Sequence, residues 1–326
     1  MKLFLSSFIV FILLSILYSG CKKDSTSPVA PPQQQSPWTE LDPGVNAGFY
    51  DVHFIDANSG YAVGSGGMII KTENGGINWT RQTSNTTQYL YGVFAIDNND
   101  AYAVGSNGTI LKTTNGGVTW RDIGWQYTST LLSVYFTDHN FGYVVGDNGD
   151  MVMTVDGFAH YTNWTFGSGN VYLKSVYFCD ALTGFIAGNS QYIWKTTNRG
   201  YNWSSQNTSG IAFNEVCFPS SNVGYLLAGH GAVYTTINGG QTWVQYTTIH
   251  ETEGLYGMCF VSDYVGYVVG EDGLILKTKD GGLEWTVQIL GAFPNPDLRS
   301  VCFINSTTGF AVGVQSKILK TTSGGE

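Results

Sequence analysis

Hydrophobic and polar residues recur along the chain in a fixed order of short segments. Each round begins with an apolar segment of the form Leu/Phe-x-small-Val/Met-x-Phe, such as residues 298–303. A Gly-Tyr/Phe-x-x-Gly segment and a glycine turn follow, and then an alternating run such as residues 109–113. Short alternating runs separated by glycine turns predict β-strands. Each round therefore predicts one sheet of four antiparallel strands, with the first strand innermost.

Every alternating run leads into a box of the form Thr-x-Asn/Asp-Gly-Gly-x-x-Trp, and the fourth strand begins at the Trp. Successive boxes start 40 to 43 residues apart, and the copy at Thr154 is degenerate. An Asn or Asp side chain accepts backbone N–H bonds in a tight turn, glycine takes positive φ, and the Trp covers neighbouring strands. We therefore interpret the box as structural. Its key positions are Asn74, Trp79, Asn115, Trp120, Asp156, Tyr161, Asn198, Trp203, Asn238, Trp243, Asp280 and Trp285.

Seven repeats of this length predict an all-β fold, a seven-bladed β-propeller of four-stranded blades over residues 36–326. The seventh box, at Thr321, stops before its Trp, whereas Trp38 lies in phase, 41 residues before Trp79. We expect the N-terminal strand after Trp38 to be the outer strand of the last blade. This closure joins the first and last blades and removes exposed sheet edges.

The composition agrees with such a fold and argues against nucleic acid as a partner. The chain has 42 Gly, 20 Tyr and 18 Phe but only 12% charged residues, which is typical of strands and turns. Its net charge of -9 opposes contact with nucleic acid or anionic headgroups, both of which attract clustered Lys and Arg. We therefore expect a monomeric propeller with no nucleic-acid partner.

The N-terminus has the features of an export signal. Lys2 precedes an apolar run to Tyr18 that is too short for a stable membrane span, which predicts a signal over residues 1–20. The small residues before Cys21 make this site similar to the lipobox at which bacterial lipoproteins are cleaved and acylated, although Leu is commoner than Tyr18 at its position. An ordinary secretory signal is the alternative.

A polar, proline-containing segment follows Cys21. Residues 21–35 are predicted to be a flexible tether between a lipid anchor and the folded body. Acylation of Cys21 would hold the protein to a bacterial membrane on its extracytoplasmic side, either periplasmic or at the cell surface.

The remaining cysteines are Cys179, Cys217, Cys259 and Cys302. An even number in an oxidising compartment allows disulfides. The last three, however, occupy one equivalent position in consecutive repeats, so each is expected to lie on its own inner strand as a small apolar residue. We predict free, buried thiols.

The box is similar to the Asp-box, or bacterial neuraminidase repeat, of sialidases and other propellers. The whole unit resembles the photosystem II stability/assembly factor-like family, as in the run from Leu90 to Val93 followed by Gly105, Gly108 and Trp120. The resemblance covers residues 36–326. It implies a non-enzymatic propeller that helps to assemble a membrane complex.

The sequence lacks the residue sets that known propeller hydrolases would require. A sialidase resemblance would require three clustered arginines, but Arg81 and Arg121 follow the box Trp, Arg199 lies inside a box, and only Arg299 is placed near the channel. A glycosidase would require two carboxyl groups close together. Asp51 and Glu215 occupy one equivalent position on the inner strands, but they belong to blades almost across the ring.

No cofactor or metal motif is visible either. The five histidines, His53, His139, His160, His230 and His250, show no metal-ligand spacing. The many glycines recur in turns between strands and not before a helix, so no phosphate loop is present. We predict a protein that is not an enzyme and carries no cofactor or metal.

The loops that enter the inner strands vary most between repeats, and variable loops on a rigid scaffold are where binding usually takes place. The second residue of each inner strand is expected to ring the channel mouth. In blade order these residues are Tyr50, Tyr91, Leu132, Lys174, Asn214, Tyr256 and Arg299. Aromatic residues and Arg often dominate binding energy. We predict binding by the aromatic and basic members of this set together with Trp125 and Tyr127 of one variable loop.

The sequence allows two kinds of partner at the channel mouth. The first hypothesis is a scaffold that holds another cell-envelope protein. The second is carbohydrate binding, or a glycoside hydrolase-like activity related to sialidase-type propellers. A third interpretation is that these side chains only fill or solvate the channel.

Overall fold

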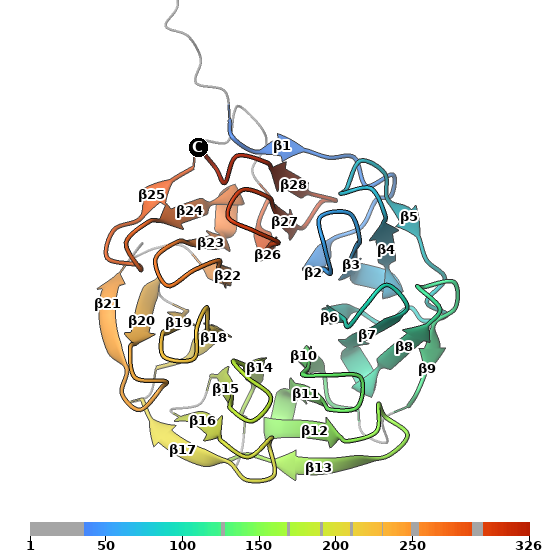
Figure 1. Ribbon diagram of the computed structural model, residues 1–326. Helices are drawn as coiled ribbons and strands as arrows, with labels where there is room; N and C mark the ends of the chain where they lie inside the picture. Colours follow the sequence, from blue (N-terminus) through green and yellow to red (C-terminus); the bar gives the residue numbers. More distant parts are fainter. Residues whose placement is uncertain are drawn as a thin grey trace, which may run out of the picture. The chain divides into compact units, whose positions relative to one another are not determined.

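The computed structural model describes residues 36–124, 128–167, 170–189, 192–208, 211–229, 231–248, 254–288 and 296–326. They form seven four-stranded antiparallel sheets arranged as blades around a central channel (Figure 1). Within these ranges, no helix has the length and hydropathy needed to span a bilayer. The predicted fold class, a seven-bladed β-propeller, is confirmed.

The strands of blades one to six run outward from the channel in sequence order. Blades one to three consist of β2 (Phe49–Phe54), β3 (Gly60–Gly64), β4 (Ile69–Thr72), β5 (Thr80–Arg81); β6 (Leu90–Ala95), β7 (Asp100–Gly105), β8 (Ile110–Thr114), β9 (Arg121–Asp122); β10 (Leu131–Phe136), β11 (Gly142–Gly146), β12 (Asp150–Thr154) and β13 (Tyr161–Thr165). Blades four and five consist of β14 (Leu173–Phe178), β15 (Gly184–Gly188), β16 (Tyr192–Thr196), β17 (Ser204–Asn207); β18 (Phe213–Cys217), β19 (Gly224–Ala228), β20 (Ala232–Thr236) and β21 (Val244–Thr248).

Blades six and seven complete the ring. They consist of β22 (Leu255–Phe260), β23 (Gly266–Gly270), β24 (Ile275–Thr278), β25 (Thr286–Val287); β26 (Leu298–Phe303), β27 (Gly309–Gly313), β28 (Ile318–Thr321) and β1 (Thr39–Glu40). Single 3-10 turns follow the second strands of blades one, two, three and six: η1 (Ser65–Gly67), η2 (Ser106–Gly108), η3 (Asp147–Gly149) and η4 (Glu271–Gly273).

The N-terminal strand closes the ring, as predicted. β1 pairs with β28 in the register Thr39↔Lys320 and Glu40↔Leu319. Trp38, which precedes β1, is 2% exposed. Its ring meets Phe303 edge-on with centroids 5.9 Å apart. First and last segments of the propeller are therefore joined by both backbone pairing and a buried aromatic.

Aromatic stacks connect neighbouring blades. In five blades the inner strand ends in Phe opposite the Gly that opens the second strand, as in the pair Phe136↔Gly142, and in blade five Phe218 directly follows the inner strand. A Cβ on that Gly would lie 2.4 to 2.6 Å from the Phe ring. The Phe ring in turn stacks on the second-strand aromatic of the preceding blade, with centroids 3.6 to 4.2 Å apart. Blade two replaces both members by alanine, in the pair Ala95↔Ala101.

Lysines on the third strands also connect the blades, a role that the sequence analysis did not predict. Each Nζ lies 5.3 to 5.6 Å from the centroid of an aromatic ring on its own second strand. It donates to a box glycine carbonyl of the next blade, for example Lys112 to Gly157 at 2.8 Å. The same bond is made by Lys71, Lys195, Lys277 and Lys320. These five lysines therefore bridge five of the seven junctions between blades.

The boxes form closed turns on one face of the ring, which we call the box face. In blade one, the N–H of Gly76 donates to Thr72 Oγ1 at 2.8 Å, and the N–H of Asn78 donates to Asn74 Oδ1 at 2.9 Å. Gly75 and Gly76 take φ values of 66° and 81°, a region that favours glycine. These contacts are made within the protein. The strand connectivity places the loops that enter the inner strands on the opposite face, which we call the mouth face.

Candidate binding site at the channel mouth

A β-bulge places one residue of every blade at the channel mouth. In all seven inner strands the register shifts between the first and third residues. The second residue is therefore left out of the pairing, and bulges of this kind re-aim a side chain. We call the seven second residues the mouth. They are Tyr50, Tyr91, Leu132, Lys174, Asn214, Tyr256 and Arg299.

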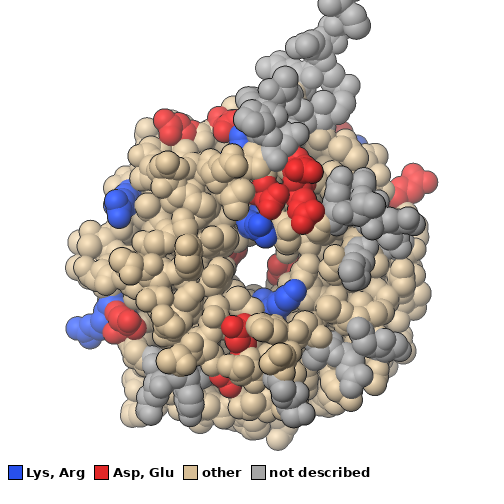
Figure 2. Space-filling view, turned by 180° about the vertical axis from the view of Figure 1, so that it is seen from behind, with Lys and Arg blue, Asp and Glu red and all other residues tan. Residues whose placement is uncertain are grey.

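The mouth residues line one cavity of about 580 Å³. Its floor is made by third residues of the inner strands, among them Asp51, Ser133, Glu215 and Ser300. Figure 2 shows the channel opening with Lys or Arg on its rim and acidic side chains beside it. The sequence analysis thus identified seven residues that the structure brings together. Trp125 and Tyr127 lie outside the described residues.

Blades one and two supply an aromatic patch. The rings of Tyr50 and Tyr91 have centroids 5.2 Å apart. Tyr89 lies 6.2 Å from Tyr50 and 6.4 Å from Tyr91, and it is 47% exposed. The sequence analysis missed Tyr89, which immediately precedes the first residue of β6. Three tyrosines in mutual contact present a large apolar surface with hydroxyl groups.

The mouth also carries two cations in different environments, Lys174 on blade four and Arg299 on blade seven. Lys174 Nζ donates to Asn214 Oδ1 at 2.7 Å, and burial lowers the pKa of this lysine. No carboxylate within the described ranges pairs with it. Arg299 pairs with Asp297 at 2.8 Å and lies over the Tyr256 ring at 4.0 Å. Lys174 is therefore the less compensated charge.

Two carboxyl groups stand at the floor of the cavity. Asp51 accepts hydrogen bonds from the Val93 N–H and from Ser300 Oγ, at 2.9 and 2.7 Å. Glu215 accepts one from Ser175 Oγ at 3.0 Å. Burial raises the pKa of Asp51 to about 6 and that of Glu215 to about 8. At neutral pH, Asp51 is therefore ionised and Glu215 is mostly protonated.

The arginines expected to lie apart do lie apart. Arg81 and Arg121 are exposed on the outer strands β5 and β9. Arg199 lies in the blade-four box, where its Nε donates to the Ala181 carbonyl and its guanidinium covers the Phe141 ring at 4.2 Å. Only Arg299 of these four lines the mouth. The described residues therefore do not assemble a three-arginine carboxylate site.

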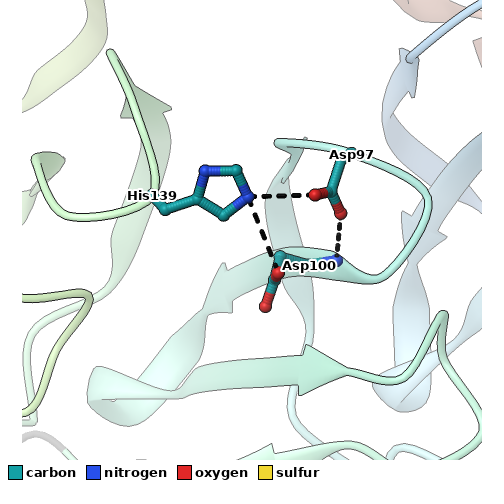
Figure 3. A group of neighbouring side chains, drawn as sticks. All are labelled: Asp97, Asp100 and His139. Carbon is teal, nitrogen blue, oxygen red and sulfur yellow. Dashed lines mark hydrogen bonds and ion pairs between the residues drawn. The ribbon is translucent and has the colours of Figure 1, made fainter.

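One group of metal-ligand side chains spans blades two and three on the box face. His139 Nε2 lies 2.9 Å from Asp97 Oδ2 and 3.7 Å from Asp100 Oδ2 (Figure 3). The Asp100 N–H donates to Asp97 Oδ1 at 2.8 Å. This bond and the His139 contact lower the pKa of Asp97. The sequence gives no signal for the group, because Asp97 and His139 lie 42 residues apart, and the contact between them is a side-chain hydrogen bond between blades.

Cys179, Cys217, Cys259 and Cys302 are free thiols, as predicted, but only Cys217 is fully buried and the other three are half-buried. The last three lie on the inner strands β18, β22 and β26. Burial raises the pKa of each of these three to about 12. They are therefore protonated at neutral pH and behave as small apolar residues.

The repeated box, the four-stranded blades and the closing N-terminal strand define a seven-bladed β-propeller of the bacterial neuraminidase repeat class. The protein-family model described as "Photosynthesis system II assembly factor YCF48" matches residues 30–128, 119–254 and 205–296. The chain belongs to this family. The predicted resemblance is confirmed.

Curated relatives match over a limited segment. "Photosystem II assembly lipoprotein Ycf48" of Synechococcus sp. (strain CC9605) is 35% identical over 75 residues, which is 23% of this chain and 21% of the relative. The protein of the same name from Prochlorococcus marinus (strain MIT 9313) is 32% identical over 84 residues, 25% of this chain and 24% of the relative. The matched segments thus span about a fifth to a quarter of these relatives.

Solved structures extend the likeness over the whole propeller. "YCF48 bound to D1 peptide" aligns with a TM-score of 0.75 at 17% identity, covering 90% of this chain and 97% of the other. "YCF48 from Cyanidioschyzon merolae" aligns at 0.72 and 18%, covering 87% and 98%. Virginiamycin B lyase from Staphylococcus aureus aligns at 0.76 and 11%, also covering 87% and 98%. At these identities the likeness is one of fold.

Proposed function

We propose that this protein is a non-enzymatic scaffold that holds a segment of a cell-envelope protein at the channel mouth. The observation that carries the proposal is the bulge in every blade, because it turns seven side chains out of the ladder and toward one cavity. Membership of an assembly-factor family supports a protein partner. The structural neighbour "YCF48 bound to D1 peptide" supports it further.

The chemistry of the mouth suits a peptide with apolar and acidic groups. Tyr50, Tyr89 and Tyr91 offer rigid contact area, and Lys174 offers a cation whose partner inside the protein is neutral. Binding energy at protein interfaces is concentrated in aromatic and basic residues of this kind. The chain as a whole carries a net charge of -9, which disfavours contact between an acidic peptide and the rest of the surface and so favours docking at the cationic rim.

We further propose that the scaffold is tethered to a membrane through acylated Cys21. The names of the curated relatives, which are called lipoproteins, support this anchor. A tethered propeller would search for its partner over a membrane surface, where a flexible linker raises the effective concentration of the two.

Carbohydrate binding is the second candidate, and the three-tyrosine patch is the observation that favours it. Aromatic faces pack against the apolar faces of sugar rings as well as against peptide side chains. The two proposals differ in what the mouth captures from native envelopes.

A photo-crosslinking experiment distinguishes them. A photoreactive phenylalanine analogue is placed at Leu132 in the mouth, and a matched analogue is placed at Val118, which is 77% exposed on the box face. We expect ultraviolet light to yield one defined protein adduct from Leu132 and none from Val118. Adducts to glycan alone would support the second candidate, and equal adducts from both positions would contradict a mouth-specific partner.

A further inference from the structure

Below the mouth, the channel continues into a second cavity of about 420 Å³. It is separated from the mouth cavity by four side chains that line both: Asp51, Ser133, Glu215 and Ser300. Its wall includes the fifth residues of all seven inner strands, and we call this space the lower chamber. These fifth residues are His53, Phe94, Tyr135, Tyr177, Cys217, Cys259 and Cys302.

One half of the wall is a continuous series of rings. His53 and Phe94 have centroids 4.5 Å apart, Phe94 and Tyr135 are 5.0 Å apart, and Tyr135 and Tyr177 are 5.3 Å apart. The two tyrosine hydroxyls donate to backbone carbonyls of the next blade, at 2.8 and 2.9 Å. These hydroxyls are therefore engaged by the protein, which leaves the rings as the lining.

At the fifth position, the other half of the wall carries small groups, although Met258, Phe260 and Phe303 of the same blades also line the cavity. Cys217, Cys259 and Cys302 stand on blades five, six and seven, where blades two, three and four carry aromatic rings at the same strand position. This asymmetry leaves space opposite the rings. The cavity volume lies in the range of about 300 to 1,000 Å³ that is usual for small-molecule sites.

The lower chamber wall is electrically neutral at physiological pH. Burial lowers the pKa of His53 to about 4 and raises those of the three thiols to about 12. His53 Nδ1 accepts the Ala95 N–H at 3.3 Å, so the ring proton is on Nε2. An anionic ligand entering this space would lose hydration without gaining a counter-charge, because the one ionised group beside it, Asp51, is itself negative.

We propose that the lower chamber is a second ligand site, which binds a small, uncharged, planar aromatic molecule stacked against Phe94 and Tyr135. The His53 Nε2–H and the Ser133 hydroxyl would supply hydrogen bonds to a polar substituent. Figure 2 shows an opening through the centre of the propeller, by which such a molecule reaches the chamber. This site does not depend on the protein partner proposed for the mouth.

The test uses 2-naphthol as the probe, because it is planar, neutral at pH 7 and can be excited at wavelengths longer than those that tryptophan absorbs. Fluorescence titration of the purified chain should give saturable binding to one site. Phe94→Ala removes a stacking ring and should weaken binding at least tenfold. Cys259→Phe fills the open half of the chamber and should abolish binding. Both variants are compared at temperatures below their measured melting points.

Two controls make the result specific. Tyr91→Ala alters the mouth and should leave the 2-naphthol affinity unchanged, while 2-naphthalenesulfonate should bind at least tenfold more weakly because it is charged. Absence of saturable binding by the folded parent chain would overturn the proposal. So would equal binding by the parent and both chamber variants, loss of binding in Tyr91→Ala alone, or equal affinity for the sulfonate.

Discussion

Lys174 donates its 2.7 Å hydrogen bond to the amide of Asn214, and Asn214 in turn donates to the Leu255 carbonyl. The chain of contacts links blades four, five and six at the channel mouth. A neutral amide orients the ammonium group without cancelling its charge. The mouth of an acidic protein thereby keeps a cation available to a partner.

Glu215, which lies at the floor of the same cavity, makes stability depend on pH. Its pKa is raised from 4.5 to about 8, so folding favours the protonated form. The resulting stability is complete below about pH 4.5 and is lost as pH rises to about 8, by up to about 1.4 kcal/mol per pH unit. Glu215→Gln cannot ionise. Between pH 6 and pH 8.5, urea unfolding should show a larger loss for the parent than for this variant, and parallel losses would contradict the assigned pKa.

The Phe136↔Gly142 pair predicts a strongly non-additive pair of mutations. Gly142→Ala would place a Cβ 2.4 Å from the Phe136 ring, and such overpacking costs about 1–3 kcal/mol. Phe136→Ala alone should cost about 3–5 kcal/mol through the cavity it leaves. The double variant reproduces the natural Ala95↔Ala101 pair of blade two and should cost clearly less than the sum. Denaturant unfolding measures the coupling, and additive effects would show that the two sites are independent.

Ring closure predicts that Trp38 stabilises the whole propeller. Trp38→Ala should lower the free energy of unfolding by about 3–5 kcal/mol and the melting temperature by several degrees, because the side chain is 2% exposed. Ile77→Ala, at a position 72% exposed, is the matched control and should change little. Equal melting curves for the parent and Trp38→Ala would place the closure elsewhere.

The proposed anchor predicts the fate of a Cys21→Ser variant. Without the thiol no lipid can be attached, so the protein should leave the membrane fraction or accumulate as an uncleaved precursor. Fractionation of cells and mass spectrometry of the mature N-terminus provide the measurement. An unchanged distribution, with no lipid on the parent protein, would rule out the anchor.

The repeat period explains how much of the molecule was predictable. Residues at one phase of a 40- to 43-residue period occupy one position in each blade, so the strand order, the closure at Trp38 and the ring of mouth residues all follow from alignment of the repeats. The bulge that turns the mouth residues inward has no separate sequence signal. It is set by the pairing of the first and second strands.

Contacts between blades were not predictable in the same way. In an alternating strand, Lys112 would be predicted to point outward into solvent. In the structure its Nζ lies over the Tyr102 ring and donates to the Gly157 carbonyl. Asp51 and Glu215 belong to blades almost across the ring, yet the narrow channel brings both to one cavity floor. Such contacts depend on the spacing and tilt of blades, which a repeat pattern does not specify.

The proposed function requires that the mouth residues bind a protein partner. The most direct test compares the parent with a mouth triple variant, Tyr91→Ala, Tyr256→Ala and Arg299→Ala, and with a box-face triple variant, Ile77→Ala, Val118→Ala and Leu283→Ala. Melting curves first show that each variant is folded. Each protein is then crosslinked through the photoreactive analogue at Leu132 in native membranes, and the amount of partner recovered with it is measured. We predict that the mouth variant loses capture while the box-face variant retains it. Full capture by the mouth variant, with loss in the box-face variant, would contradict the account and move the interface to the opposite face.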